Sequence, residues 1–198
     1  PFCMIGKGRF LLDTGIPDSV GSGELVICGM RHVLGDAPIP GFRPDNISEI
    51  MGVRVDGVIG GDILCTHGVR FDLAAGQASF APVIPGRKFL VSDTVKIVGV
   101  TPLPVIQVHV NDIDLALGFD SGASVTCLID DSDLLTGEPD DRQQVFFGTL
   151  NRFYDLEFRN REAVIGNIHV KLQHARLPEA MAADLRRRRC ARERHEIR

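Results

Sequence analysis

The chain has 198 residues, of which 44% are hydrophobic, so it is long enough for one domain or for two small lobes that share a core. With 22 basic against 26 acidic residues, the formal net charge of −4 excludes a general attraction to nucleic acid, and no nucleic-acid partner is expected. No run of about 18 apolar residues occurs, so the sequence predicts no transmembrane segment. The first residues also lack the pattern of a signal peptide, and the compartment stays unassigned.

The five cysteines are odd in number and form no Cys-x-x-Cys pair, which disfavours a disulfide framework and a zinc knuckle. The six histidines are dispersed without the spacing of a common metal motif. We therefore expect no metal and no other cofactor.

Short stretches rich in Val, Ile, Leu and Phe recur between Gly, Pro, Asn and Asp, which predicts a mainly β chain. Strands are expected at 9–12, 24–27, 53–59, 69–73, 78–80, 94–98, 105–110, 115–119, 144–147 and 168–172. Helix is expected only in short pieces, at 61–64, 131–135 and 179–189.

Two hairpins are predicted to end in an aspartate. Residues 105–119 form two apolar runs separated by the turn pair Asn111-Asp112, and Asp120 follows them. Residues 2–12 repeat this pattern more loosely around a turn at 6–8, and they lead into Asp13. This repetition predicts an internal duplication with diverged halves.

A second echo supports the duplication, because residues 26–30 resemble residues 164–168. The Pro- and Gly-containing stretch within 80–99 is the best boundary between the halves. We therefore predict an N-terminal lobe at 1–90 and a C-terminal lobe at 91–180. Residues 181–198 are predicted to form a basic tail or, alternatively, an incomplete part of the second lobe.

The two aspartates lie in closely related motifs. The first half contains Leu11-Leu12-Asp13-Thr14-Gly15, followed later by Val58-Ile59-Gly60, and the second half contains Phe119-Asp120-Ser121-Gly122. In these motifs the chain resembles the retropepsin-like and pepsin-like aspartic peptidases, whose mark is an apolar strand ending in Asp-Thr/Ser-Gly and a later apolar-apolar-Gly loop. The resemblance spans about residues 9–178.

The resemblance implies a two-lobed acid-protease β-barrel fold, an extended polypeptide as substrate, and a monomer that carries both catalytic residues. It implies that Asp13 and Asp120 are the catalytic pair. The residues expected to support them are Thr14, Gly15, Ser121, Gly122, Ile59 and Gly60. The hydroxyls of Thr14 and Ser121 are expected to form hydrogen bonds between the two loops, and the glycines to allow tight turns.

The chemistry explains why such loops occur in pairs. Two carboxylates about 3 Å apart cannot both ionise, so they share one proton near the working pH. The ionised member takes a proton from a water that attacks the peptide carbonyl, and the protonated member hydrogen-bonds the carbonyl oxygen. The resemblance thus implies the function of an aspartic endopeptidase.

Three alternatives remain open at the level of sequence. A catalytically inactive peptide-binding or scaffold domain of the same fold is favoured by Ile16-Pro17 after the first motif and by the lack of a clear second-half counterpart of residues 56–60. A homodimer of the N-terminal half would make Asp120 dispensable. In an unrelated β-barrel, both aspartates would be ordinary Asx-turn residues about 15 Å or more apart.

Overall fold

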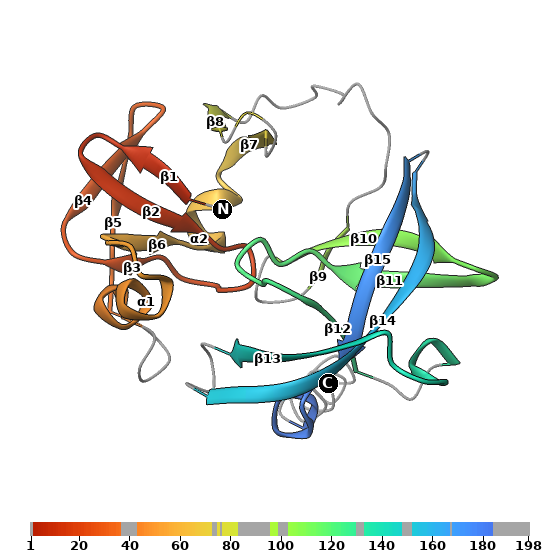
Figure 1. Ribbon diagram of the computed structural model, residues 1–198. Helices are drawn as coiled ribbons and strands as arrows, with labels where there is room; N and C mark the ends of the chain where they lie inside the picture. The colour runs from red at the N-terminus through yellow and green to blue at the C-terminus, as the bar shows by residue number, and fades with distance from the viewer. Residues whose placement is uncertain are drawn as a thin grey trace, which may run out of the picture. The chain divides into compact units, whose positions relative to one another are not determined.

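The computed structural model describes residues 2–36, 43–72, 75, 77–82, 96–98, 103–129, 133–147, 152–166 and 168–183. The protein is mainly β, as predicted, with short helices between the strands (Figure 1). The chain divides into two compact units, of which the first comprises Pro1–Ser124 with Val164–Ile168 and the second comprises Val125–Ala163 with His169–Arg198. Both aspartate motifs therefore lie in the first unit.

A four-stranded sheet forms the framework of the first unit, in the order β1 (Phe2–Ile5), β2 (Gly8–Leu12), β6 (Gly57–Ile59) and β3 (Val20–Gly21). The first two strands form the predicted antiparallel hairpin, whose turn contains Gly6 with a φ of 60°. Strand β6 runs parallel to β2 and antiparallel to β3. The central position of β6 explains why all three of its residues are buried.

The remaining strands of the first unit form hairpins. These are β4 (Glu24–Ile27) with β5 (Met30–Val33), β7 (His67–Asp72) with β8 (Gln77–Pro82), and β10 (Leu103–Val110) with β11 (Ile113–Gly118), and β9 (Lys96–Val98) pairs with β10. Figure 1 shows β10 and β11 as a long green hairpin. The first unit has a buried apolar cluster, to which β2, β4, β6 and α2 (Gly61–Leu64) contribute. It consists of Phe10, Leu12, Leu25, Ile27, Leu34, Ile59, Ile63 and Leu64.

Helix α1 (Pro44–Met51) was not predicted from the sequence. It begins with Pro at the first turn, which is compatible with a helix start because that position needs no N–H donor, and it ends at Gly52 in the left-handed conformation. Its one buried residue, Ile47, packs in a cluster with Ile16, Val20, Val55 and Val58. Helix α2 (Gly61–Leu64) forms at the predicted place, directly after β6.

The strand predicted at 53–59 is wrong in its first part, because β6 begins only at Gly57. The Asp56 carboxylate accepts the Arg9 backbone N–H at 2.8 Å and a hydrogen bond from Arg54 Nε at 2.7 Å. These contacts hold the pKa of the Asp56 carboxyl below its usual value, with the Arg9 amide as the main cause. The Arg9 amide, which a longer β6 would pair with a backbone carbonyl, is thus bonded to the Asp56 side chain instead.

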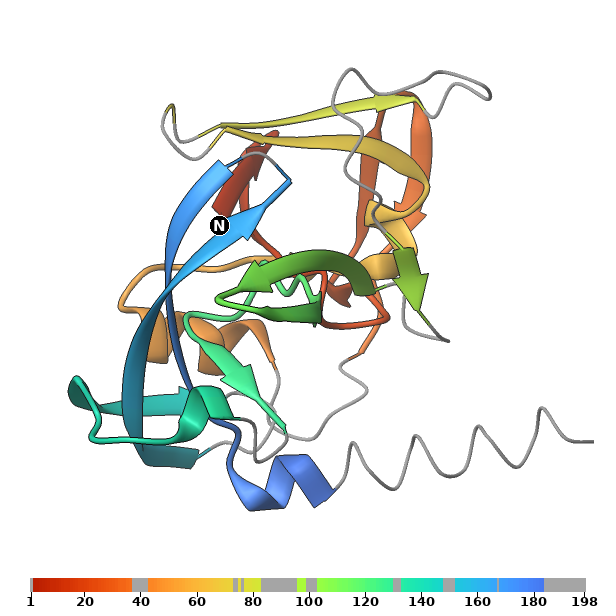
Figure 2. The ribbon, with the colours of Figure 1, turned by 90° about the vertical axis from the view of Figure 1, so that its right-hand side faces the viewer.

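The second unit contains β12 (Thr126–Leu128), the 3-10 turn Asp133–Leu135, β13 (Asp141–Phe147) and most of β14 (Arg152–Ile165) and β15 (Ile168–Arg176). The end of β14 and the start of β15, within Val164–Ile168, belong to the first unit. Strands β14 and β15 form the long blue hairpin of Figure 2. Strand β13 pairs antiparallel with β14, and β12 pairs parallel with β15. The core of this unit is Val145, Leu156, Phe158 and Ala175.

The echo between residues 26–30 and 164–168 corresponds to two hairpin connections, since β4 and β5 meet at Cys28-Gly29 and only two residues separate the end of β14 from the start of β15. The predicted helix at 179–189 is helical from 179 to 183, and the rest of it lies outside the described residues, as does most of the basic tail at 181–198. The division into lobes at 1–90 and 91–180 stays a prediction.

Candidate functional site

The first aspartate loop begins where β2 ends. The Asp13 amide donates to the Ile59 carbonyl oxygen at 3.0 Å, which continues the pairing of β2 with β6 by one residue. The Asp13 Oδ1 accepts the Gly15 N–H at 2.8 Å, so the carboxylate closes a tight turn. Only 7% of Asp13 is exposed, which places its carboxyl group in an environment that disfavours charge.

The second aspartate loop follows β11 in the same way. The Phe119 amide donates to the Pro104 carbonyl at 2.6 Å and extends the hairpin to the residue before Asp120. The Asp120 Oδ1 accepts the amides of Gly122 at 2.8 Å and Ala123 at 3.1 Å. Each aspartate therefore caps its own Asx turn, but Asp120 is exposed where Asp13 is buried.

Four hydrogen bonds join the two loops reciprocally. The Thr14 amide donates to Ser121 Oγ at 3.1 Å, and the Ser121 amide donates to Thr14 Oγ1 at 2.9 Å. The Thr14 hydroxyl donates to the Phe119 carbonyl at 2.5 Å, and the Ser121 hydroxyl donates to the Leu12 carbonyl at 2.9 Å. We call these four bonds the interlock. Each hydroxyl thus accepts one bond from the other loop and donates one to it, as the sequence predicted of the Thr14 and Ser121 hydroxyls.

The interlock brings the two carboxyl groups together. A Cβ atom added at Gly15 would overlap the Asp120 carboxyl group, and a Cβ added at Gly122 would overlap the Asp13 carboxyl group. Each carboxyl therefore lies against the glycine of the opposite loop, in a space that only the absence of a side chain leaves open. The alternative with both aspartates as unrelated turn residues about 15 Å apart is wrong.

The electrostatics of the pair differ from those of two separate surface carboxylates. The pKa of the Asp13 carboxyl is raised from 3.8 to about 7, mainly by burial and next by the charge of the neighbouring Asp120, with a hydrogen bond between the two side chains as a smaller cause. The amides of Gly15 and Ile16 lower the pKa, but to a smaller extent than burial raises it. Over most of the acidic range Asp13 thus carries a proton beside Asp120.

The Ile59-Gly60 loop packs directly against the first aspartate loop. Ile59 is fully buried, and its carbonyl accepts the Asp13 amide. A Cβ added at Gly60 would lie 2.8 to 3.1 Å from backbone atoms of Asp18 and Ile16, so the two backbones are in direct contact. Pro17 lacks an N–H, yet its carbonyl accepts the Asp62 amide at 2.8 Å, so it is compatible with this contact.

Two polar residues of this region were not selected from the sequence. The buried Ser19 hydroxyl accepts the Gly60 amide at 2.9 Å and donates to Asp62 Oδ1 at 2.6 Å. Asp62 stands directly after the Gly60-Gly61 pair, and this adjacency was a usable signal. Ser19 lies in an ordinary turn sequence, and nothing in the sequence distinguishes it.

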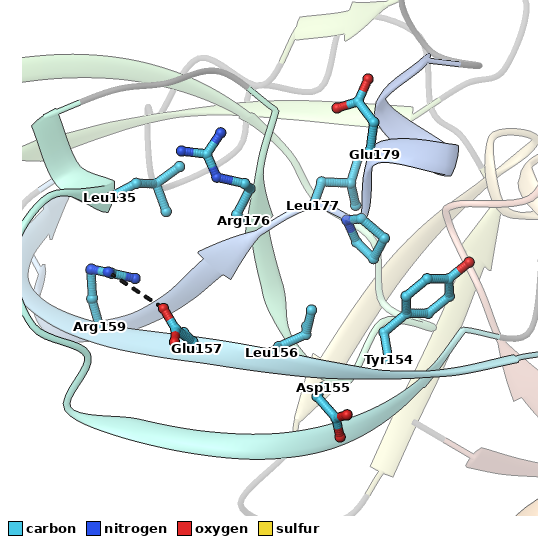
Figure 3. A pocket seen from close by; sticks show the side chains of 10 residues that line it. Leu135, Tyr154, Asp155, Leu156, Glu157, Arg159, Arg176, Leu177 and Glu179 are labelled. Carbon is cyan, nitrogen blue, oxygen red and sulfur yellow. Dashed lines mark ion pairs between the residues drawn. The ribbon is translucent and has the colours of Figure 1, made fainter.

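A separate pocket lies in the second unit, away from either aspartate motif in the chain. Its volume is about 380 Å³, and it is lined by residues of β14, by Leu135 of the 3-10 turn, by Arg176 at the end of β15 and by the segment that follows (Figure 3). Its apolar lining includes Leu135, Leu156 and Leu177. Among its charged residues, Glu157 forms an ion pair with Arg142 at 2.9 Å. The carboxylates at this pocket are thus partly neutralised, and the paired aspartates remain the better candidate site.

Within the described ranges, no group of three or more His, Cys, Asp or Glu side chains comes together in a way that could hold a metal ion. No helix in that part of the chain is both long enough and apolar enough to cross a bilayer. No protein-family model matches the chain, and no curated protein matches it. Any function inferred for it therefore rests on the chemistry of its own residues.

Proposed function

We propose that this chain is an aspartic endopeptidase, in which Asp13 and Asp120 activate a water molecule for attack on a peptide bond. The observation that carries the proposal is the interlock, because it holds two aspartates from distant parts of one chain with their carboxyl groups in contact. Two independent Asx turns have no need of such reciprocal bonds. A peptidase of this kind needs them, since its two carboxyls must share one proton.

The difference in burial suggests a division of labour within the pair. The exposed Asp120, as the ionised member, takes a proton from the bound water as that water attacks the carbonyl carbon. Asp13, as the protonated member, donates its proton to the carbonyl oxygen of the substrate. When the tetrahedral intermediate collapses, the C–N bond breaks and the carboxyl that gained the proton of the water delivers it to the leaving amine. A hydroxyl of the intermediate returns a proton to Asp13 as the new carbonyl forms, which restores the starting pair. The roles belong to the pair, because the two titrations are coupled.

The two-lobed acid-protease architecture with an internal duplication is part of the same proposal. It is supported by the matching order of elements, since β1 and β2 lead to Asp13 as β10 and β11 lead to Asp120. The substrate would be an extended polypeptide held through its main chain, and the reaction would need no cofactor. The working unit would be a monomer, since one chain supplies both carboxyls of the pair.

The test is cleavage of a peptide library from about pH 3 to 8 by the wild type, Asp13→Asn and Asp120→Asn. We expect the wild type to cleave in the acidic range and to lose activity as the pH rises through about 7, where Asp13 gives up its proton. Each variant should lose at least about 10³-fold in kcat/KM, because neither carboxyl can act alone.

The matched control is Asp112→Asn, which changes an exposed aspartate in the turn of the hairpin that leads to Asp120. It should cleave like the wild type. A well-folded wild type without activity at any pH would remove the peptidase proposal in favour of the inactive binding domain, which Ile16-Pro17 suggests. Full activity of Asp120→Asn would instead favour a homodimer of the N-terminal half.

A further inference from the structure

The Ser19 hydroxyl joins the segment after the first aspartate loop to the connection between β6 and α2. Only 3% of Ser19 is exposed. Its oxygen accepts the Gly60 amide at 2.9 Å, and its proton goes to Asp62 Oδ1 at 2.6 Å. A buried hydroxyl that both accepts and donates cannot be removed without leaving the Gly60 amide without its partner, at a cost of about 1–3 kcal/mol for a buried group.

Three further hydrogen bonds run between the same two segments. The Asp13 amide donates to Ile59 O at 3.0 Å, the Gly61 amide to Ile16 O at 2.9 Å, and the Asp62 amide to Pro17 O at 2.8 Å. Residues 13–19 therefore lie along residues 59–62 from one end to the other. The Ser19 contact closes the far end of this strip, and the Asp13 contact closes the near end.

The second aspartate loop depends on the first. Its own amides at Gly122 and Ala123 turn back to Asp120, and the Phe119 amide pairs with Pro104 of its own hairpin. Its bonds to the other loop go to Leu12 and Thr14. The orientation of Asp120 relative to Asp13 is therefore set through the interlock. A displacement of the strip that carries Asp13 would separate both carboxyl groups.

We infer that Ser19 and Asp62 act as a positioning pair, which holds residues 13–19 against α2 so that Asp13 meets Asp120. This inference rests on the proposed function for its effect on catalysis, but the geometry of the pair can be tested without activity. Neither residue lies among those expected to touch the substrate. They are positioning residues, and their loss should lower kcat while leaving KM nearly unchanged.

The experiment compares two matched pairs of variants. Asp62→Asn keeps an acceptor for the Ser19 hydroxyl, and Asp62→Leu has a similar size without one; because Asp62 is exposed, both should fold. Ser19→Thr keeps the hydroxyl, and Ser19→Ala removes it. We expect Asp62→Leu and Ser19→Ala to lose about 10- to 100-fold in kcat with KM changed less than about threefold, and Asp62→Asn and Ser19→Thr to stay within about threefold of the wild type.

The second readout is the pKa of the Asp13 carboxyl, followed by NMR in the same variants. If the pair positions the loop, Asp62→Leu and Ser19→Ala should let water reach Asp13, and its pKa should fall from about 7 towards 3.8. An Asp13 pKa unchanged in both of these variants would overturn the inference, whatever the activity. If the wild type cleaves nothing but the Asp13 pKa falls in Asp62→Leu and Ser19→Ala, the peptidase proposal is removed and the positioning pair stands.

Discussion

At the scale of single residues, the site depends on side chains that are absent as much as on those that are present. Gly15 and Gly122 are not in the left-handed conformation, so their role is not to permit an unusual turn. They leave room for the carboxyl group of the opposite aspartate. The glycine of each Asp-Thr/Ser-Gly motif thus serves the other motif.

If the aspartate pair is catalytic as proposed, Gly15→Ala should displace the Asp120 carboxyl group and lower kcat/KM by about 100-fold, because an error of about 1 Å in a catalytic group has that effect. Stability should change little, since Asp120 is exposed and its carboxyl can move into solvent. The measurement is peptide cleavage alongside urea unfolding. Gly68→Ala in β7 is the control, because its Cβ would make only ordinary contacts of 3.6 Å or more. Wild-type kinetics in Gly15→Ala would mean that the carboxyl does not occupy this space during catalysis.

At the scale of elements, β6 is held by close contacts with the backbone of β3 and with a side chain of β2. A Cβ added at Gly57 would lie 2.7 Å from the Val20 carbonyl oxygen and 3.0 Å from the Phe10 ring. The carbonyl is part of β3, which pairs with β6, so it cannot move away without breaking the sheet. Position 57 therefore requires glycine for reasons of packing.

Gly57→Ala should accordingly lower the free energy of unfolding by about 1–3 kcal/mol, the usual cost of overpacking a core. Chemical denaturation at fixed pH measures this change, and Gly68→Ala again serves as the control. A loss below about 0.5 kcal/mol would show that β3 yields easily and that β6 is less tightly held than its contacts indicate.

The sequence predicted those elements whose pattern is local. The hairpins before Asp13 and Asp120, the short helix Gly61–Leu64 and the strand Glu24–Ile27 all follow from local patterns of apolar residues and turn residues. Helix α1 escaped prediction because Pro44-Asp45-Asn46 reads as a loop and only Ile47 is buried. The start of β6 was misplaced because Asp56 satisfies a backbone amide of a distant strand, which no local pattern reveals.

The residues that carry the chemistry of the candidate site could be predicted from the sequence. The packing and the hydrogen bonds that hold those residues in place could be predicted less well. Two related motifs predicted the loops and the exchange of hydroxyl bonds between them. The burial of Asp13 against the exposure of Asp120 could not be predicted, because it depends on packing around two nearly identical sequences. Ser19 was missed for the same reason, since its partners lie 41 and 43 residues further along the chain.

At the scale of the whole molecule, the site makes stability depend on pH. The pKa of the Asp13 carboxyl rises from 3.8 in the unfolded chain to about 7 in the fold, so the folded state binds a proton that the unfolded state releases. The stabilisation of the fold by this bound proton is fully present below about pH 4 and is lost as the pH rises through about 7. Its upper limit is about 4 kcal/mol.

We therefore expect Asp13→Asn, which mimics the neutral carboxyl, to gain stability relative to the wild type as the pH rises from about 4 to about 7. Urea unfolding of both proteins across this range measures the difference. Asp112→Asn should show no such trend. A constant difference between Asp13→Asn and the wild type would mean that Asp13 is ionised in the fold at acidic pH, which would contradict the sharing of one proton.

The interlock also has a consequence in time. It joins Thr14 to Ser121, which are 107 residues apart, so a growing chain has made its first aspartate loop long before the partner loop exists. At about 5–20 residues per second, the interval during synthesis is roughly 5 to 20 s. Until then Thr14 has no partner hydroxyl and Asp13 has no second carboxyl. If the pair cleaves peptides, an unfinished chain cannot do so. Activity can then arise only after the second aspartate loop has been synthesised and has bonded to the first.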